Sequence, residues 1–163
     1  YASLVGSILY LANCTRPDIS FAVNTLARYF SAPIEASFKL AKQLLRYCIA
    51  TREDGLTFGP GTDSSPLNVV GYSDSDYGNA RFTLEDQPVS RRSVSGFVFL
   101  INGTPVTWQS KKQAVMARST DDAEYIGLAT SASTGLWIRK LLGEMNGIFE
   151  PLTIYGDNTA AVM

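Results

Sequence analysis

Residues 71–80 read GYSDSDYGNA, and this stretch places two carboxylates at the end of an apolar run. In an extended strand alternate side chains share a face, so Tyr72, Asp74 and Asp76 are expected to point to one side and Gly71 to the other. Two like charges this close repel each other and raise each other's pKa, which costs stability unless water or a cation screens them. The stretch therefore predicts a strand that ends in a site for positive charge.

The residues before this strand favour helices, and the residues after it favour strands. Three helices are expected over 2–13, 17–30 and 33–50, with Ser31 as a cap for the third. The later patterns predict further strands and one long helix. They comprise a short strand at 55–58, strands at 67–74, 93–103, 104–112 and 152–157, the long helix at 119–145, and the start of a helix at 158–163.

The loop at 59–66 is rich in Gly, Pro and Ser, which is typical of a boundary between domains. We therefore expect a helical segment over residues 1–60 and an α/β domain over 67–163. In the second domain, three strands, a helix, a strand and a helix indicate a mixed sheet flanked by helices.

Composition narrows the chemistry of this chain to carboxylates. The 163 residues contain no histidine, which removes the usual Ser or Cys triads. Cys14 and Cys48 lie far apart, so we expect buried thiols rather than a zinc site or a disulfide. Fourteen basic and fifteen acidic residues argue weakly against a strongly basic nucleic-acid binder. No apolar run approaches the roughly 20 residues of a membrane helix, so a cytosolic or nuclear setting without membrane contact is expected.

The long helix is expected to present one glutamate to the sheet. At about 100° per residue, Glu124 shares a face with small and apolar residues, namely Gly127, Leu128, Ser131, Gly135, Ile138, Leu142 and Met145. That face should pack on the sheet, and an unpaired buried carboxylate there would be costly. Asp121 and Asp122 have an ordinary explanation as first-turn acids, with Ser119 or Thr120 as the helix cap. Trp108 and Trp137 are expected to pack in the core rather than stack on bases.

A third acid, Asp157, ends the last predicted strand and has two interpretations. It can cap the helix that follows, which the sequence alone favours, or it can converge with Asp74 and Glu124, because strand ends collect catalytic groups. Three acids without histidine or cysteine form a hard oxygen site suited to Mg²⁺ or Mn²⁺. Two such ions about 4 Å apart can promote in-line hydrolysis of a phosphodiester without a protein base.

Several motifs, in order, resemble the ribonuclease H domain of copia-type retrotransposon Pol polyproteins. They are GYSDSDYGN (71–79), RRSVSGFVFLINGTPVTWQSKKQ (91–113), ARSTDDAEYIGLATSASTGLWIRKLL (117–142) and IYGDNTAAV (154–162). Residues 1–58 are similar to the segment that follows the reverse-transcriptase palm in the same polyproteins.

The resemblance implies a ribonuclease H-like fold and a metal-dependent endonuclease. Such an enzyme hydrolyses the RNA strand of an RNA–DNA hybrid during reverse transcription, with Mg²⁺ or Mn²⁺ held by acids. By position, the catalytic ligands are Asp74, Glu124 and Asp157, with Asp76 less favoured than Asp74. The implied partner is the remainder of the polyprotein with its reverse-transcriptase domain, in a cytoplasmic virus-like particle or in the nucleus.

The sequence departs from the family pattern at three places. The family supplies a fourth carboxylate beyond the point where Met163 ends this sequence, so we expect the carboxyl-terminal part of the fold to be missing. Tyr77 stands where the family often carries tryptophan. Residues 81–88 (RFTLEDQP) form a longer and less basic loop than the usual short acidic loop of the family.

Basic residues near the acids are the candidates for contacts with nucleic-acid phosphates, which position a duplex without reading its sequence. They are Arg81, Arg91, Arg92, Lys111, Lys112 and Arg118, and each taken alone also fits a solvated face. Two alternatives stay open: a truncated, non-catalytic relic or module that grips nucleic acid or a polyprotein partner, and, less favoured, an integrase or transposase of the same broad fold. The sequence does not indicate an oligomeric state.

Overall fold

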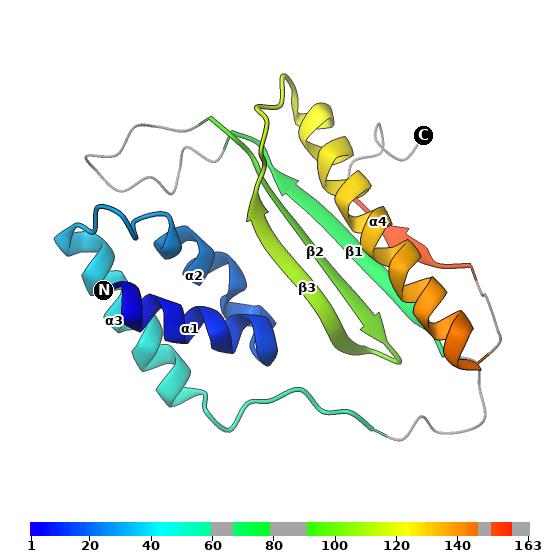
Figure 1. The fold of residues 1–163 in the computed structure, drawn as a ribbon, viewed down its shortest axis with the longest axis horizontal. Coiled ribbons are helices and arrows are strands. Elements are labelled where there is room, and N and C mark those ends of the chain that lie inside the picture. Colours follow the sequence, from blue (N-terminus) through cyan, green and yellow to red (C-terminus); the bar gives the residue numbers. More distant parts are fainter. Residues whose placement is uncertain (60–66, 79–90, 147–150, 158–163) are drawn as a thin grey trace.

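The computed structural model describes residues 1–59, 67–78, 91–146 and 151–157, and it shows a sheet with helices on both sides (Figure 1). The helices are α1 (Ala2–Cys14), the short 3₁₀ helix η1 (Pro17–Ile19), α2 (Ser20–Ala27), α3 (Glu35–Ala50) and α4 (Thr120–Asn146). The strands are β1 (Val69–Asp76), β2 (Val94–Ile101), β3 (Thr104–Lys112) and β4 (Thr153–Tyr155). The predicted α/β class and mixed sheet are confirmed, and the arrangement is compatible with a ribonuclease H-like fold.

The sheet has the strand order β3-β2-β1-β4. β1 and β2 are antiparallel, as are β2 and β3, whereas β4 runs parallel to β1 and pairs only with Val70–Tyr72. Asn102 and Gly103 join β2 to β3 with positive φ angles of 49° and 83°, as a tight hairpin turn requires. Because β4 stops beside Tyr72, the last part of β1 has a free edge within the described structure.

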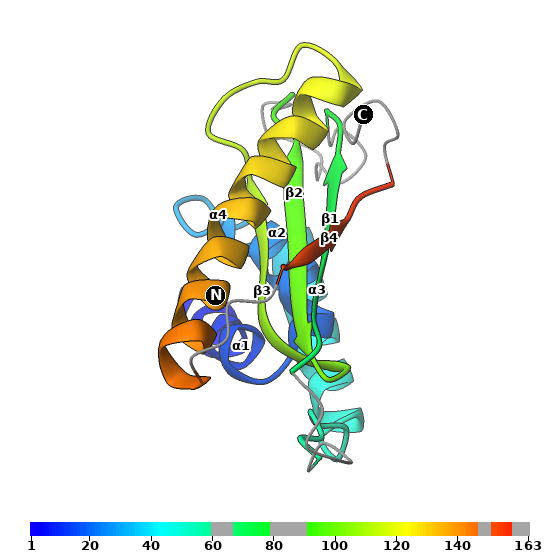
Figure 2. The same cartoon turned by 90° about the vertical axis from the view of Figure 1, so that its right-hand side faces the viewer.

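The two faces of β1 differ as the alternation in its sequence predicts. Gly71, Ser73 and Ser75 are buried beneath α4, whereas the side chains that alternate with them, Tyr72, Asp74 and Asp76, are exposed on the opposite face. Figure 2 shows α4 lying along one face of the sheet, with β4 next to β1. The acids of β1 therefore leave the sheet on the side away from α4.

Close approach of α4 to the sheet depends on glycines. A Cβ atom on Gly127 would lie 2.3 Å from Ser75 Oγ, and one on Gly135 would lie 3.1 Å from the ring of Phe99. Phe99 is fully buried between α4 and β1, where a Cβ on Gly71 would also meet its ring at 2.5 Å. These positions leave no room for a side chain, so they set the distance between helix and sheet.

Two expectations for α4 are wrong. Trp137 is 60% exposed because it lies on the outward side of the helix, about half a turn from the buried stripe. Met145 is 74% exposed at the edge of that stripe, in the last turn of α4. The other members of the expected stripe, from Glu124 to Leu142, are buried or half-buried.

The helices α1, α2 and α3 form a separate core on the other side of the sheet. Its buried residues are Val5, Ile8, Ala12, Ile19, Val23, Leu26, Ala41 and Cys48. Trp108 of β3 links this core to the sheet, because its Nε1–H donates a 2.7 Å hydrogen bond to the carbonyl oxygen of Ala12. Trp108 therefore packs between the sheet and the helical core, as expected. No helix in the described part of the chain is both long and apolar enough to span a membrane.

Several local expectations in this part of the chain are wrong. Ser31 does not cap α3, which starts at Glu35; instead Ser37 Oγ donates to the carbonyl oxygen of Ile34 at 2.7 Å. The single helix expected over 17–30 is instead the 3₁₀ turn η1 followed by α2, which ends at Ala27. Residues 55–58 form no strand, and Cys14 is exposed. The boundary loop at 60–66 and the helix expected at 158–163 lie outside the described residues.

Candidate metal centre

Three carboxylates from three different elements meet at the free edge of β1. Asp74 comes from β1, Glu124 from the first turns of α4, and Asp157 follows β4 by two residues. One oxygen of each lies within 4.8 Å of the others. Asp74 and Asp157 are exposed, whereas Glu124 is 8% exposed. The structure thus brings together the acids that the sequence placed on separate elements.

The backbone of β1 fixes the position of the Glu124 carboxylate. The N–H of Ser75 donates a 3.2 Å hydrogen bond to Glu124 Oε1. This N–H is available because β4 has already ended at Tyr155, which pairs with Tyr72. The side chain of Glu124 therefore reaches from α4 to the edge of β1, next to Asp74.

The site disfavours the ionised form of Glu124, because this carboxyl is buried next to two other acids. Burial raises the pKa of this carboxyl above its ordinary value, and the nearby charges of Asp74 and Asp157 raise it further. The hydrogen bond from the Ser75 N–H acts in the opposite direction and lowers the pKa in part. A cation bound among the three groups would offset both the repulsion and the loss of hydration.

The raised pKa predicts how stability depends on pH in metal-free buffer. The folded state holds the Glu124 proton to a higher pH than the unfolded state, so stability falls as pH rises from the ordinary value near 4.5 through the raised value. Glu124→Gln cannot ionise, so this variant should lose less free energy of unfolding than the parent between about pH 4 and pH 8. Denaturant unfolding across that range measures the difference. Glu144→Gln, an exposed glutamate on the same helix, is the control, and parallel curves for Glu124→Gln and the parent would contradict the prediction.

Side chains that the sequence did not single out hold the first turns of α4 in place. Gln113 is buried directly after β3, and its Nε2 donates to Ser95 Oγ at 2.7 Å and to the Ala123 carbonyl oxygen at 2.9 Å. The Oγ atoms of Ser75 and Ser95 lie 3.0 Å apart. These bonds tie α4 to β1 and β2 next to Glu124. No sequence signal marks Gln113, because its partners are distant in the chain.

Of the two caps expected for α4, Ser119 and Thr120, the structure shows Ser119. Ser119 Oγ accepts a 3.0 Å hydrogen bond from the Asp122 N–H. Asp122 Oδ2 in turn accepts from the Nε–H of Arg118 at 3.1 Å. Arg118, a candidate phosphate contact, is therefore paired with an acid in this structure.

The remaining candidate residues are spread over the sheet. Asp76 is exposed on the same face as Asp74 but is outside the three-carboxylate cluster. Arg91 and Arg92 are exposed just before β2, and Lys111 is exposed, whereas Lys112 is half-buried. Lys111 and Lys112 are successive residues of β3, so their side chains point to opposite faces of the sheet. The loop at 81–88, which includes Arg81, and any helix that Asp157 would cap lie outside the described residues.

The donor set fits a divalent cation of the Mg²⁺ or Mn²⁺ type. All three ligand atoms are carboxylate oxygens, which such hard ions prefer. Two oxygens on opposite sides of one Mg²⁺ span about 4.2 Å, at about 2.1 Å each. Oxygens separated by the full 4.8 Å would need to approach by about half an ångström, a movement open to the exposed side chains of Asp74 and Asp157.

Comparison with known proteins finds relatives among transposon proteins. The chain is 33% identical over 162 residues to the retrovirus-related Pol polyprotein from transposon TNT 1-94 of Nicotiana tabacum, covering 99% of this chain and 11% of the relative. It is 36% identical over 162 residues to the retrovirus-related Pol polyprotein from transposon RE1 of Arabidopsis thaliana, covering 99% of this chain and 10% of the relative. The chain thus spans about a tenth of the length of these polyproteins.

A relative of similar length bears a different name. The chain is 38% identical over 138 residues to secreted RxLR effector protein 161 of Plasmopara viticola, covering 85% of this chain and 90% of the relative. No family model and no solved structure matches the chain.

Proposed function

Because the chain belongs to the family of sequences related to transposon Pol polyproteins, we propose that it is a ribonuclease H-type endonuclease that hydrolyses the RNA strand of RNA–DNA hybrids. The observation that carries the proposal is the meeting of Asp74, Glu124 and Asp157, with one oxygen of each within 4.8 Å of the others. The order of motifs resembling ribonuclease H supports the same assignment.

In the proposed mechanism Asp74, Glu124 and Asp157 would hold divalent cations. Such ions, when bound, supply the Lewis-acid chemistry for in-line displacement at phosphorus. The chain itself fixes Glu124 through the Ser75 N–H and holds α4 through Gln113, so one ligand is in place before substrate arrives. Asp74 and Asp157 are exposed, which leaves the other side of the centre open to a nucleic-acid strand.

A cleavage assay with matched duplexes tests this function. With Mg²⁺ or Mn²⁺, the chain should cut the labelled RNA strand of an RNA–DNA hybrid and leave a DNA duplex of the same sequence intact. The ribose 2′-hydroxyl is the group that distinguishes the two substrates. The cutting should stop when EDTA removes the metal. Equal cutting of both duplexes, or no cutting of the hybrid with either metal, would contradict the proposal.

The second candidate that the sequence left open is a non-catalytic module that grips nucleic acid or a polyprotein partner. Such a module has no need of three converging carboxylates, which cost stability without a cation. The two candidates differ in their response to Mg²⁺, because only a working site gains thermal stability from the ion.

A further inference from the structure

The face of the sheet opposite α4 carries a groove of about 920 Å³ that begins at the metal centre. It is lined by residues of all four strands and by the Pro17–Phe21 region of the helical segment. Asp74, Asp76 and Asp157 lie along it, and so does the stacked pair of Tyr72 and Tyr155, whose ring centroids are 5.5 Å apart.

Strand register connects the acidic side of this groove to a basic residue. Asp76 pairs with Val94, and Val94 pairs with Lys112 on β3. Directly opposed residues point to the same face of a sheet, so Lys112 shares the face of Asp76. Two strand spacings separate their backbones by about 10 Å.

Two further cations gather around Lys112. The Gln113 N–H donates a 2.8 Å hydrogen bond to the Ser93 carbonyl oxygen, which places Arg92 beside the end of β3. Arg28 follows the end of α2, and α2 packs against β3. The pKa of Lys112 is lowered by burial first and then by the charges of Arg28 and Arg92, so Lys112 lies close enough to each arginine to be repelled by it.

Two of these three cations, Lys112 and Arg28, have no ion-pair partner among the described residues. Arg28 is half-buried, and burial lowers its pKa as well. An anion bound between these groups would relieve both the repulsion and the desolvation.

We propose that Lys112, together with Arg28 and Arg92, forms a second subsite that binds a backbone phosphate of the nucleic acid whose scissile phosphodiester lies at Asp74. This subsite rests on the proposed function, and it adds a contact from the helical segment to those from the sheet. The strand would cross the groove from the edge at β4 to the edge at β3. Its phosphate contact positions the substrate without reading its sequence.

Binding without metal tests this subsite separately from cleavage. The probe is a fluorescein-labelled RNA–DNA hybrid in EDTA, and its anisotropy is followed from about 50 to 200 mM salt. Lys112→Gln should reduce the slope of log K against log salt by about 0.7–0.9, the value for one lost phosphate contact. At about 50 mM salt this corresponds to roughly tenfold weaker binding. Lys112→Arg keeps the charge and should keep the slope.

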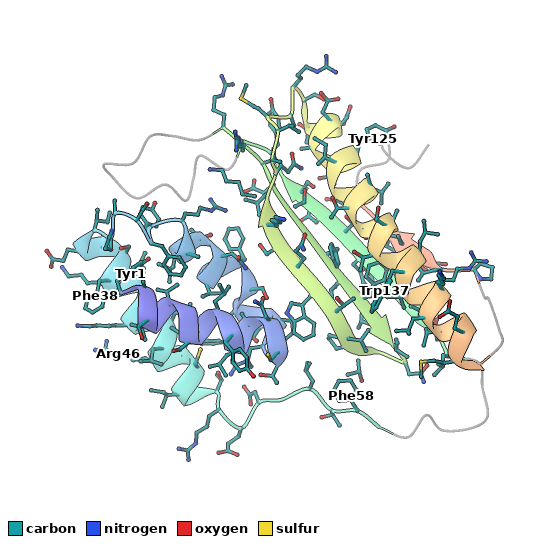
Figure 3. The ribbon with its side chains drawn as sticks, in the orientation of Figure 1. Tyr1, Phe38, Arg46, Phe58, Tyr125 and Trp137 are labelled. Carbon is teal, nitrogen blue, oxygen red and sulfur yellow. The ribbon has the colours of Figure 1, made fainter. Side chains whose placement is uncertain are left out.

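Arg46→Gln is the matched control. It removes one positive charge from α3, where Figure 3 shows Arg46 on the side of the helical segment away from the sheet. Its slope should equal that of the parent. Thermal unfolding checks that each variant is folded, and Arg28→Gln replaces Lys112→Gln if the latter is not. Equal slopes for the parent and the subsite variant would overturn the subsite.

The outcomes for subsite and function are distinguishable. A parent chain that cuts the hybrid while Lys112→Gln binds with an unchanged slope refutes the subsite alone. If Lys112→Gln reduces the slope of log K against log salt but the parent leaves the hybrid uncut with both metals, the nuclease is refuted and the subsite is supported. A parent chain that does not bind the hybrid in EDTA at about 50 mM salt overturns the subsite.

Discussion

Glu124→Gln should slow metal-dependent cleavage of the hybrid by about a thousandfold or more. Glutamine keeps the volume of the side chain and the Oε1 atom that accepts from the Ser75 N–H, so the position of α4 is preserved. It removes the one buried negative charge among the three ligands. Metal-ion catalysis is worth several kcal/mol, and about 4 kcal/mol corresponds to a thousandfold in rate. Single-turnover cleavage of labelled hybrid in Mg²⁺ measures the effect.

The same variant should lose the stabilisation that Mg²⁺ gives to the folded state. At 100 times its dissociation constant a ligand contributes about 2.7 kcal/mol. At about 2–4 °C per kcal/mol for a chain of this size, the parent should gain roughly 5–10 °C in Tm. Because Glu124→Gln binds the ion more weakly, it should gain much less at the same Mg²⁺ concentration. This second measurement is independent of substrate.

Glu144→Gln provides the control for this pair of measurements. It is the same substitution on the same helix, at an exposed residue whose Oε1 lies 3.8 Å from Lys140 Nζ. It should cut the hybrid at the parent rate and keep the Mg²⁺-dependent gain in Tm. If Glu124→Gln behaves like Glu144→Gln in both assays, Glu124 is not a metal ligand.

The parts of the site that local periodicity determines could be predicted from the sequence. Alternation along β1 predicted that Asp74 and Asp76 share one face of the strand and that Gly71 points to the other, as the structure has them. The helical period of α4 placed Glu124 on the face toward the sheet. Both inferences use only the fixed geometry of a single element.

The meeting of the three acids depends on contacts that no local pattern contains. Asp157 reaches the site because β4 runs parallel to β1 and ends beside Tyr72, a pairing between residues far apart in the sequence. The sequence alone therefore left Asp157 as either a helix cap or a ligand. Gln113 was missed for the same reason, since its bonds to Ser95 and Ala123 are also tertiary.

The failed expectations come from short or weak local signals. Residues 55–58 have the composition of a strand, but a stretch of this length forms one only where a partner strand is available. Ser31 has the chemistry of a cap, yet the chain enters α3 three residues later, through Ile34. Trp137 was assigned to the core from its residue type, although its helical position points outward.

Phe99→Ala should lower the free energy of unfolding by about 3–5 kcal/mol, the largest effect on stability expected for a single side chain here. The ring is fully buried between β1 and α4 and fills the space that Gly71 and Gly135 leave open. The backbone around those glycines is held in regular strand and helix, so it can collapse only partly into the cavity. At about 2–4 °C per kcal/mol, Tm should fall by roughly 6–20 °C.

Trp137→Ala tests whether burial rather than aromatic size determines this loss. Trp137 is the larger side chain and lies on the same helix that covers Phe99, but it is 60% exposed. Its replacement should change the free energy of unfolding by about 0.5 kcal/mol or less. Chemical denaturation of both variants in one buffer measures the comparison. A loss for Trp137→Ala as large as that for Phe99→Ala would mean that the outer face of α4 is covered in solution, and the packing of α4 described above would then be incomplete.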